Sequence, residues 1–466
     1  MITIFNTLSK KKEEFKPIKN KTVSFYHCGP TVYWTQHIGN LRAMIEADLI
    51  VRSLEYQNYK VKLVRNYTDV GHLTSDEDEG EDKITKGAKR DKKTPQEIAD
   101  KYIAQFDKDL ELLNTRQANY KPRATEMIKE MIKMTKKLLT KGFAYSTDLA
   151  IYFDVTKAKD YNRLSKQQLN QNIDEAGKGR ISDSNKKHSA DFALWFFKAG
   201  THENALQTWP SPFKSNLVND GEGFPGWHIE CSAMSQKLLG DTIDIHMGGI
   251  EHIPVHHTNE IAQSESYTGK KFVNYWLHNE HLMINNGKMA KSDGTSYILQ
   301  DIINKGFNPL AFRYFVMGAH YRSKINFTWP AMESAQKAYD NFTTLVGNLG
   351  TPKIGCAEYE QKFLEAISDD FNIPKALALT WDLLKSDYPD SAKKASILKF
   401  DKVFGLNLKW FKPTKIPDEI KEITKQREQF RVDKNWTKSD IIRDELLKRG
   451  WQIEDTDAGP IIKKVK

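Results

Sequence analysis

The stretch Cys28-Gly-Pro-Thr-Val-Tyr-Trp-Thr-Gln-His-Ile-Gly-Asn40 lies between a β-rich run, Thr22 to Tyr26, and a helical pattern. Apolar residues from Leu41 to Leu49 recur at the spacing of one helix face, and Val61 to Asn66 is again an extended run. The order strand, helix, strand predicts a βαβ unit. Ligands of open α/β sheets bind beyond the carboxyl ends of the strands, and a helix that starts there offers backbone N–H groups to phosphate. We therefore expect a phosphate site on this stretch.

The composition is that of a folded chain with a modest positive charge. The chain has 466 residues, 39% hydrophobic and 28% charged, and at this length we expect about three or four domains. Its 70 basic and 61 acidic side chains leave a net charge of +9, which permits a polyanionic partner without requiring one. No run approaches the roughly 18 apolar residues of a membrane span, and Met1 to Lys21 lacks a signal-peptide core. We expect no membrane partner.

The chain has three cysteines, namely Cys28, Cys231 and Cys356. A small and odd number of cysteines does not fit a disulfide framework. This count predicts a reducing compartment, so we expect a cytoplasmic protein. Cys356 falls in a short linker between two helical patterns, and we interpret it as an unengaged thiol.

Two separated motifs carry a family resemblance. His37-Ile-Gly-Asn40 resembles the H-I-G-H signature of class I aminoacyl-tRNA synthetases, and Lys288-Met-Ala-Lys-Ser292 resembles their K-M-S-K-S signature. The prefix Cys28-Gly-Pro-Thr-Val-Tyr33, together with Gly226-Trp-His-Ile-Glu-Cys-Ser-Ala-Met234 and His256-His-Thr-Asn-Glu-Ile-Ala-Gln-Ser264, is similar to cysteinyl-tRNA synthetase. The resemblance covers almost the whole chain.

The patterns and the resemblance together imply an α/β fold. It would be a class I synthetase Rossmann-type nucleotide-binding catalytic domain with an inserted segment, followed by a helical bundle and a small C-terminal α+β anticodon-binding domain. The expected divisions are the first catalytic half at 1–120, the insertion at 121–220, the second catalytic half at 221–285, a lid loop and stem-contact region at 286–325, the bundle at 326–415 and the anticodon-binding domain at 416–466.

Two connecting segments allow local predictions. Thr74 to Lys93 is dense in charged residues and glycine, and we expect a solvated loop there. Asn285-Asn-Gly287 predicts a tight hairpin turn after the run His281 to Ile284. The K-M-S-K-S-like motif would then lie on a loop tip.

A metal site is the first chemical expectation. His256 and Glu260 are four residues apart and share a face of a predicted helix, but unpaired cysteines are more often buried as small apolar residues. The resemblance implies that Cys28, Cys231, His256 and Glu260 bind one Zn²⁺ per chain. Thiolate, imidazole and carboxylate are ordinary zinc ligands, and a soft metal favours the sulfur of cysteine over the hydroxyl of serine.

The second expectation is an ATP site. The resemblance implies that His37, Gly39, Asn40, Lys288 and Lys291 bind ATP, which would bring Mg²⁺. Gly39 would let the adenine approach, His37 and Asn40 would donate hydrogen bonds to phosphate, and the two lysines would neutralise pyrophosphate. Taken alone, the lysines fit a solvated basic turn. Ala290 replaces the middle serine of the signature.

The remaining expected sites contact the amino acid and the RNA. The resemblance implies that Cys28, Gly29, Thr68 and Trp227 line the cysteine pocket; from the residues alone Trp227 fits a core tryptophan equally well. It also implies an anticodon contact by residues of the tail, namely Arg431, Trp436, Asp440 and Asp455. An exposed tryptophan can stack on a base, but a small helical domain with a core tryptophan is an equal alternative.

The function that follows is the ATP-dependent ligation of L-cysteine to cysteine tRNA through a cysteinyl-adenylate, by a monomer. Two alternatives remain. One is a related ligase that joins cysteine to an amino sugar, although such enzymes lack an anticodon-binding module. The other is a non-catalytic tRNA-binding paralogue, which the retained motif residues disfavour.

Overall fold

A computed structural model describes residues 1–70, 83–166, 183–287, 296–410, 417–456 and 459–464. The α-helices are α1 (Ile38–Tyr56), α2 (Lys83–Asp91), α3 (Pro95–Leu112), α4 (Ile128–Thr140), α6 (Trp227–Leu239), α7 (His256–Thr268), α8 (Leu299–Asn304), α9 (Pro309–Met317), α10 (Trp329–Asn348), α11 (Ala357–Ser368), α12 (Ile373–Lys385), α13 (Asp390–Phe404), α14 (Asp418–Val432) and α15 (Trp436–Lys448). The strands are β1 (Thr3–Asn6), β2 (Lys11–Glu14), β3 (Thr22–His27), β4 (Lys60–Arg65), β5 (Ala144–Ser146), β6 (Ala150–Phe153), β7 (Phe192–Phe197), β8 (Gly223–Pro225), β9 (Ile243–Gly249), β10 (Val273–Asn279), β11 (Leu282–Ile284), β12 (Ile325–Phe327), β13 (Trp451–Thr456) and β14 (Gly459–Lys464).

The central sheet has the strand order β10-β9-β3-β4, and every pair in it is parallel. Helix α1 connects β3 to β4, and helix α7 connects β9 to β10. Each half is thus a βαβ unit, as the sequence predicts. Because the two halves meet at β3 and β9, the strand order reverses there, and such a switch point is where α/β sheets bind ligands.

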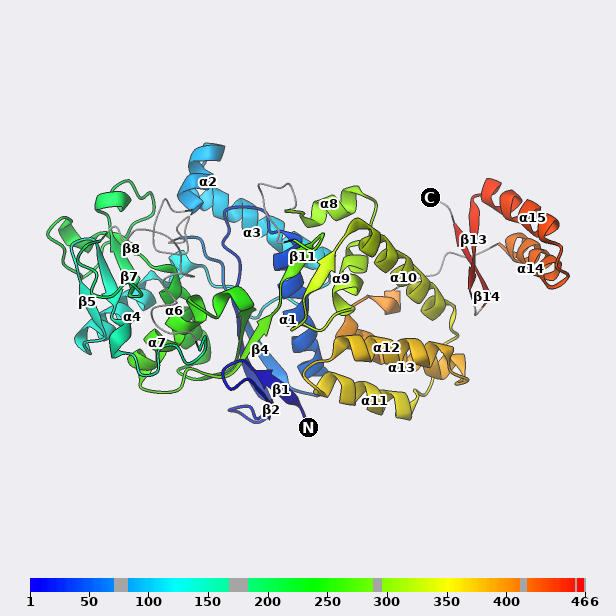
Figure 1. The fold of residues 1–466 in the computed structure, drawn as a ribbon, viewed down its shortest axis with the longest axis horizontal. Helices are drawn as coiled ribbons and strands as arrows, with labels where there is room; N and C mark the ends of the chain where they lie inside the picture. Colours follow the sequence, from blue (N-terminus) through cyan, green and yellow to red (C-terminus); the bar gives the residue numbers. More distant parts are fainter. Residues whose placement is uncertain (71–82, 167–182, 288–295, 411–416, 457–458, 465–466) are drawn as a thin grey trace.

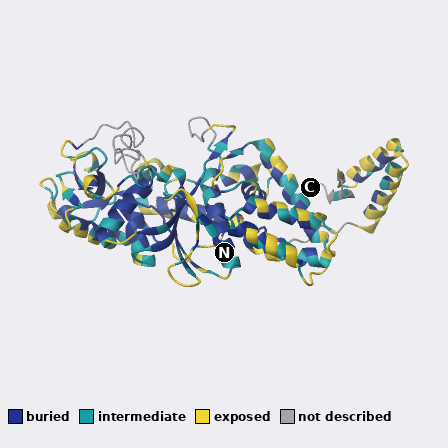
Figure 2. Cartoon of the chain, turned by 60° about the horizontal axis from the view of Figure 1, so that its bottom comes forward, coloured by how far each residue is buried: buried dark blue, intermediate teal, exposed yellow. Residues whose placement is uncertain are grey.

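The central sheet is covered on both faces. Tyr275 and Leu277 of β10 pack in one apolar cluster with α1, while Trp276 between them packs in another with α6 and α7. This alternation follows the two-residue period of a strand. Figure 2 shows the middle of the molecule mostly in the buried colour, whereas the helices at the end away from it carry exposed faces.

Three further groups of elements lie outside this sheet. An antiparallel sheet of order β5-β6-β7-β8 falls between β4 and β9 in the sequence. Helices α9 to α13 form a bundle that shares its apolar core with the outer side of α1 and with α2 and α3. Helices α14 and α15 and the hairpin β13–β14 form a small unit with its own apolar core, drawn at one end of Figure 1.

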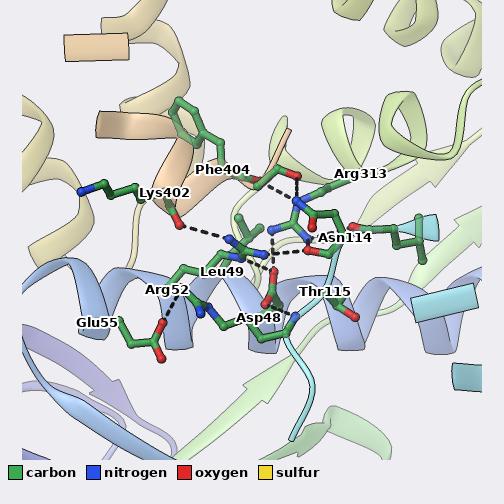
Figure 3. A network of polar contacts seen from close by, with 12 residues as sticks. Asp48, Leu49, Arg52, Glu55, Asn114, Thr115, Arg313, Lys402 and Phe404 are labelled. Atoms are coloured by element: carbon green, nitrogen blue, oxygen red, sulfur yellow. Dashed lines mark hydrogen bonds and ion pairs between the residues drawn. The ribbon is translucent and has the colours of Figure 1, made fainter. Parts of the chain in front are cut away.

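Helix α1 is tied to its surroundings by two buried ion pairs. Arg42 donates to Glu46 (Nε–Oε1 2.7 Å) and to the carbonyl oxygens of His281, Tyr321 and Ser323. Two residues after Glu46, Asp48 accepts from Arg52 (2.7 Å), from Arg313 of α9 (2.6 Å) and from the backbone N–H of Arg116 (2.7 Å). Figure 3 shows how the two arginines of this second network also donate to carbonyl groups of Asn114, Lys402 and Phe404. The helix is thereby fixed against the segments that follow β10 and α9 and against α13 of the bundle.

Some local predictions need correction. Within the segment expected to be a loop, Lys83–Asp91 is a helix, because Ile84 and Ala88 reach the core; residues 74–82 lie outside the described residues. Cys356 is a free cysteine at the end of the linker before α11, as the sequence predicts, but it is buried, and its backbone N–H donates to Ser396 Oγ at 2.7 Å.

The tight turn at Asn285-Asn-Gly287 is confirmed. Asn285 and Asn286 have φ of 49° and 64°, which asparagine tolerates, and Ile284 and Gly287 exchange backbone hydrogen bonds of 2.9 and 2.8 Å. Strand β11 before the turn pairs in parallel with β12. Among the helices of the described residues, none has the length and apolarity needed to cross a bilayer.

Candidate functional site

A cavity of about 300 Å³ opens at the switch point between β3 and β9. The stretch that follows β3 forms one wall, and the glycines that end β9 form another. The lining residues are His27, Cys28, Gly29, Pro30, Thr31, Tyr33, Trp34, Thr35, Gln36, His37, Asn40, Ala43, Met44, Lys83, Gly248, Gly249, Glu251 and His252.

The H-I-G-H-like residues lie where α1 begins at this cavity. His37 is the N-cap, and its Nδ1 accepts a hydrogen bond from the backbone N–H of Asn40 at 3.2 Å. The side chain of Asn40 donates to Gln36 Oε1 at 2.5 Å. Gly39 lies between them in the first helical turn. Capping orients the His37 ring and leaves both side chains half-buried at the cavity wall.

Two segments approach each other closely at the base of the cavity. A Cβ on Gly29 would lie 1.7 Å from the carbonyl oxygen of Asn66, so only glycine fits there. The backbone N–H of Gly29 donates to Asn66 Oδ1 at 2.9 Å. Asn66 in turn donates to Thr68 Oγ1, which donates to Glu230 Oε2 at 3.0 Å. This chain of hydrogen bonds fixes Gly29 and Thr68 against α6.

The four residues expected to bind metal come together. One donor atom each from Cys28, Cys231, His256 and Glu260 lies within 4.8 Å of the other three, and all four residues are buried. Cys28 comes from the first half of the sheet, Cys231 from α6, and the other two from α7. The cluster therefore exists only when both halves are assembled, and Cys28 connects it to the cavity.

Sequence reasoning missed a second set of donors beside the first. Cys28, His246, His257 and Glu260 also bring one donor atom each within 4.8 Å of one another. His246 Nε2 lies 2.9 Å from Glu260 Oε2, and His257 Nδ1 lies 2.7 Å from His278 Nε2. His246 lies in the middle of the buried strand β9, where a histidine is expected to be part of the core, so only the sheet face that it shares with its neighbours could have indicated it. Partners of this kind orient metal ligands and tune their basicity.

The electrostatics of the cluster ionise two of its donors, Cys231 and Glu260, and keep the other two, Cys28 and His256, protonated. A hydrogen bond from Cys28 lowers the pKa of Cys231 to about 6, whereas burial raises the pKa of Cys28 well above its usual value. Burial opposes the charge on Glu260, but His246 and His256 outweigh it and lower its pKa to about 2. Burial likewise lowers the pKa of His256, while Glu260 and Cys231 raise it to about 10. A metal ion would displace the protons of Cys28 and His256.

Trp227 lies over this cluster. Its indole stacks on the His256 ring with centroids 4.1 Å apart and an interplanar angle of 11°. It is half-buried at the first position of α6. The tryptophan thus contacts a residue of the metal set directly.

The K-M-S-K-S-like residues Lys288 and Lys291, with Ala290, lie outside the described residues. The described chain resumes at residue 296, and the backbone N–H of Ile38 donates to the carbonyl of Tyr297 at 2.8 Å. The chain that follows this motif therefore contacts the start of α1.

The tail residues lie in the small C-terminal unit. Trp436 begins α15 and is 56% exposed, and Asp440 is exposed one turn further along the same helix. The guanidinium of Arg431 lies 5.8 Å from the centre of the Trp436 ring. Asp455 accepts from buried Arg427 at 2.7 and 2.8 Å and from Arg431 at 3.1 Å. Arg431 and Asp455 are thus paired with each other beside the exposed indole.

Comparison with known proteins agrees with this geometry. Residues 14–337 match the family described as tRNA synthetases class I (C) catalytic domain. The cysteine--tRNA ligase 1 of Burkholderia lata is 41% identical over 463 residues, covering 98% of this chain and 96% of that protein. The cysteine--tRNA ligase of Treponema denticola is 41% identical over 492 residues, covering 97% of this chain and 98% of that protein.

A solved structure supports the fold. A methionyl-tRNA synthetase of Mycobacterium tuberculosis, in complex with methionyl-adenylate, superimposes with a TM-score of 0.55 at 12% identity, covering 82% of this chain and 89% of that one. The predicted class I fold is confirmed. On the full-length similarity and the matched catalytic domain, this chain belongs to the cysteine--tRNA ligase family of class I tRNA synthetases.

Proposed function

We propose that the protein ligates L-cysteine to cysteine tRNA, using ATP and a cysteinyl-adenylate. The observation that carries this proposal is the buried Cys₂HisGlu cluster, which Cys28 connects to a cavity whose wall holds His37 and Asn40. A thiol-selecting centre and a phosphate-binding helix start in one cavity suit the activation of cysteine. The relatives named cysteine--tRNA ligase support the same activity over nearly the whole chain.

The metal would be one Zn²⁺, held by Cys28, Cys231, His256 and Glu260. Two sulfur donors, an imidazole and a carboxylate fit zinc in chemistry, and all four residues are buried. When bound, zinc with an open position would take the substrate sulfur as thiolate and disfavour the hydroxyl of serine. His246 would hold the Glu260 carboxylate through its 2.9 Å contact.

The chain's own residues would position ATP and cysteine. His37 and Asn40 would donate to phosphate, Gly39 would admit the adenine, and Lys288 and Lys291 would neutralise pyrophosphate with Mg²⁺. Because activation needs no covalent enzyme intermediate, positioning and charge stabilisation supply the catalysis. Gly29, Thr68 and Trp227 would line the amino acid pocket beside Cys28.

The small C-terminal unit would bind the anticodon. Trp436, 56% exposed, would stack on a base, and Asp440 on the same helix would contact a base edge. The ion pair between Asp455 and Arg431 would orient the arginine beside that indole. We propose a cytoplasmic monomer. An amino-sugar ligase would not need this unit, and a non-catalytic paralogue would not need the buried metal donors.

The decisive experiment is ATP–pyrophosphate exchange with cysteine and serine in parallel, followed by charging of cysteine tRNA. We expect exchange with cysteine to exceed exchange with serine by at least about 10³-fold, which corresponds to roughly 4 kcal/mol. Charging of tRNA should accompany it. Exchange without charging would support the amino-sugar ligase, and neither activity would support the non-catalytic paralogue.

The metal is tested with two cysteine variants. Cys231→Ala should lose bound zinc and cysteine-dependent exchange, whereas Cys356→Ala should keep both, because Cys356 lies in the bundle core. Metal analysis of the purified proteins measures the zinc. Equal zinc in wild type and Cys231→Ala would contradict the assignment of that ligand.

A further inference from the structure

Helix α2 contributes a cation to the cavity. Lys83, its first residue, is half-buried and lines the cavity with His37 and Asn40. Among the described lining residues it is the single lysine or arginine, and Glu251 adds a negative charge. A cavity that accepts a triphosphate needs positive charge. Among the described lining residues, the lysine that supplies it is the first residue of α2.

Packing of α2 against the core fixes its position. Ile84 and Ala88, four residues apart, are buried in the cluster that contains Val32 and Ile98. Gly87 lies so close that a Cβ there would be 3.3 Å from Ile98 Cγ2 and 3.5 Å from the Tyr33 carbonyl oxygen. The helix therefore rests directly on the stretch that forms the cavity wall.

The other end of α2 is also tied to that wall. The guanidinium of Arg90 lies 4.2 Å from the centre of the Trp34 ring, and its Nη2 donates to the Tyr102 hydroxyl at 3.2 Å. Trp34 and Tyr102 are stacked with centroids 6.3 Å apart. Lys83, Gly87 and Arg90 follow the spacing of one helix face, so the contacts of Gly87 and Arg90 turn Lys83 toward the cavity.

We propose that Lys83 binds the phosphate groups of ATP and is a further catalytic residue for adenylate formation; this inference rests on the proposed function. In that step a carboxylate oxygen of cysteine forms a bond to the α-phosphorus, and the bond from that phosphorus to the bridging oxygen breaks. Pyrophosphate leaves with the electron pair. An ammonium group beside the phosphates stabilises the charge that moves onto the leaving group.

The variant Lys83→Met tests this role against Lys86→Met, an exposed lysine of the same helix. In ATP–pyrophosphate exchange, Lys83→Met should lower kcat/KM for ATP by about tenfold to a hundredfold, as the loss of a charge-assisted contact predicts. The KM for cysteine should change less than about twofold, since Lys83 is not among the residues proposed to hold cysteine. Lys83→Arg should restore part of the activity, and Lys86→Met should match wild type.

A binding measurement separates this proposal from the proposed function. Calorimetry with ATP and with inorganic pyrophosphate, without cysteine, should show at least about tenfold weaker binding for Lys83→Met. If wild type binds ATP but does not activate cysteine, the proposed function fails and the role of Lys83 is still decided by binding. If Lys83→Met binds ATP and pyrophosphate as wild type does, with unchanged kcat/KM for ATP, the proposal is overturned.

Discussion

Helix α1 carries two buried carboxylates, Glu46 and Asp48, whose pKa values are shifted in opposite directions. Burial raises the pKa of Glu46 to about 8, although Arg42 lies 2.7 Å away. Burial also opposes the charge on Asp48, but Arg313 and Arg52 outweigh it and lower its pKa. The difference lies in the number of donors that each carboxylate receives.

The donors around each arginine explain that difference. Arg42 donates its remaining N–H groups to the carbonyl oxygens of His281, Tyr321 and Ser323. Glu46 Oε2 has no hydrogen-bond partner among the described residues. Asp48 receives two guanidinium groups and a backbone N–H (Figure 3). The Arg42–Glu46 ion pair thus holds backbone segments in place, but one oxygen of its carboxylate is left without a donor. The Asp48 carboxylate, in contrast, has donors for both of its oxygens.

The largest expected effect comes from breaking the Asp48 network. Asp48→Asn should reduce the free energy of unfolding by about 3–5 kcal/mol at neutral pH, because it leaves buried Arg313 and half-buried Arg52 without their counter-charge. Chemical denaturation followed by tryptophan fluorescence measures this loss. Glu55→Gln is the control: Glu55 is partly exposed and pairs with Arg116, so it should cost less than about 1 kcal/mol. Equal losses would show that the network is not stronger than a surface pair.

The second expected effect is a dependence of the free energy of unfolding on pH, caused by Glu46. Its folded pKa of about 8 exceeds the usual carboxyl value, so the folded protein binds more protons than the unfolded chain between about pH 4.5 and 8. Stability should therefore fall as pH rises through that window, by at most about 1.4 kcal/mol per pH unit. Glu46→Gln should remove this slope. Parallel stability curves for wild type and variant between pH 6 and 8 would contradict the raised pKa.

The pH dependence of stability that Asp48 contributes has the opposite sign. Because its folded pKa is lowered, its contribution is present above the unfolded value of about 3.9 and is lost only as pH falls through the folded pKa. The Glu46→Gln variant should therefore retain this loss of stability in acid.

The smallest effect should follow Arg52→Lys. Arg52 donates to Asp48 and to the carbonyls of Asn114 and Lys402, and one ammonium group keeps the charge but cannot make all three contacts. We expect a loss of about 1 kcal/mol in the free energy of unfolding. A loss as large as that of Asp48→Asn would mean that hydrogen-bond geometry, rather than charge, holds the network together.

The sequence predicted the parts of the molecule that follow local periodicity or a motif. The βαβ unit around Cys28 to Asn40 and the turn at Asn285 both appear in the structure. The meeting of Cys28, Cys231, His256 and Glu260 was predicted only through the resemblance, since their spacing is unlike that of a local metal motif.

The missed features depend on tertiary contacts. Helix α2 has a polar composition. Its few apolar residues indicate a buried helix face only once Val32 and Ile98 are known to lie in the same apolar cluster. In the sequence, His246 belongs to a buried strand and Glu230 to a helix, and neither pattern indicates a polar contact. In the structure, His246 contacts Glu260 and Glu230 contacts Thr68. Lys83 could not be assigned to the cavity because its position depends on the stack of Arg90 on Trp34.

The central place of β3 sets an order of assembly for the molecule. β3 pairs on one side with β4, which is near in sequence, and on the other with β9, where Phe25 meets Ile245. Closing the shorter loop costs less chain entropy, so we expect the β3–α1–β4 unit to form early and the pairing with β9 to form late. The donor cluster can therefore capture an ion only near the end of folding, and metal uptake would report the completion of the native sheet.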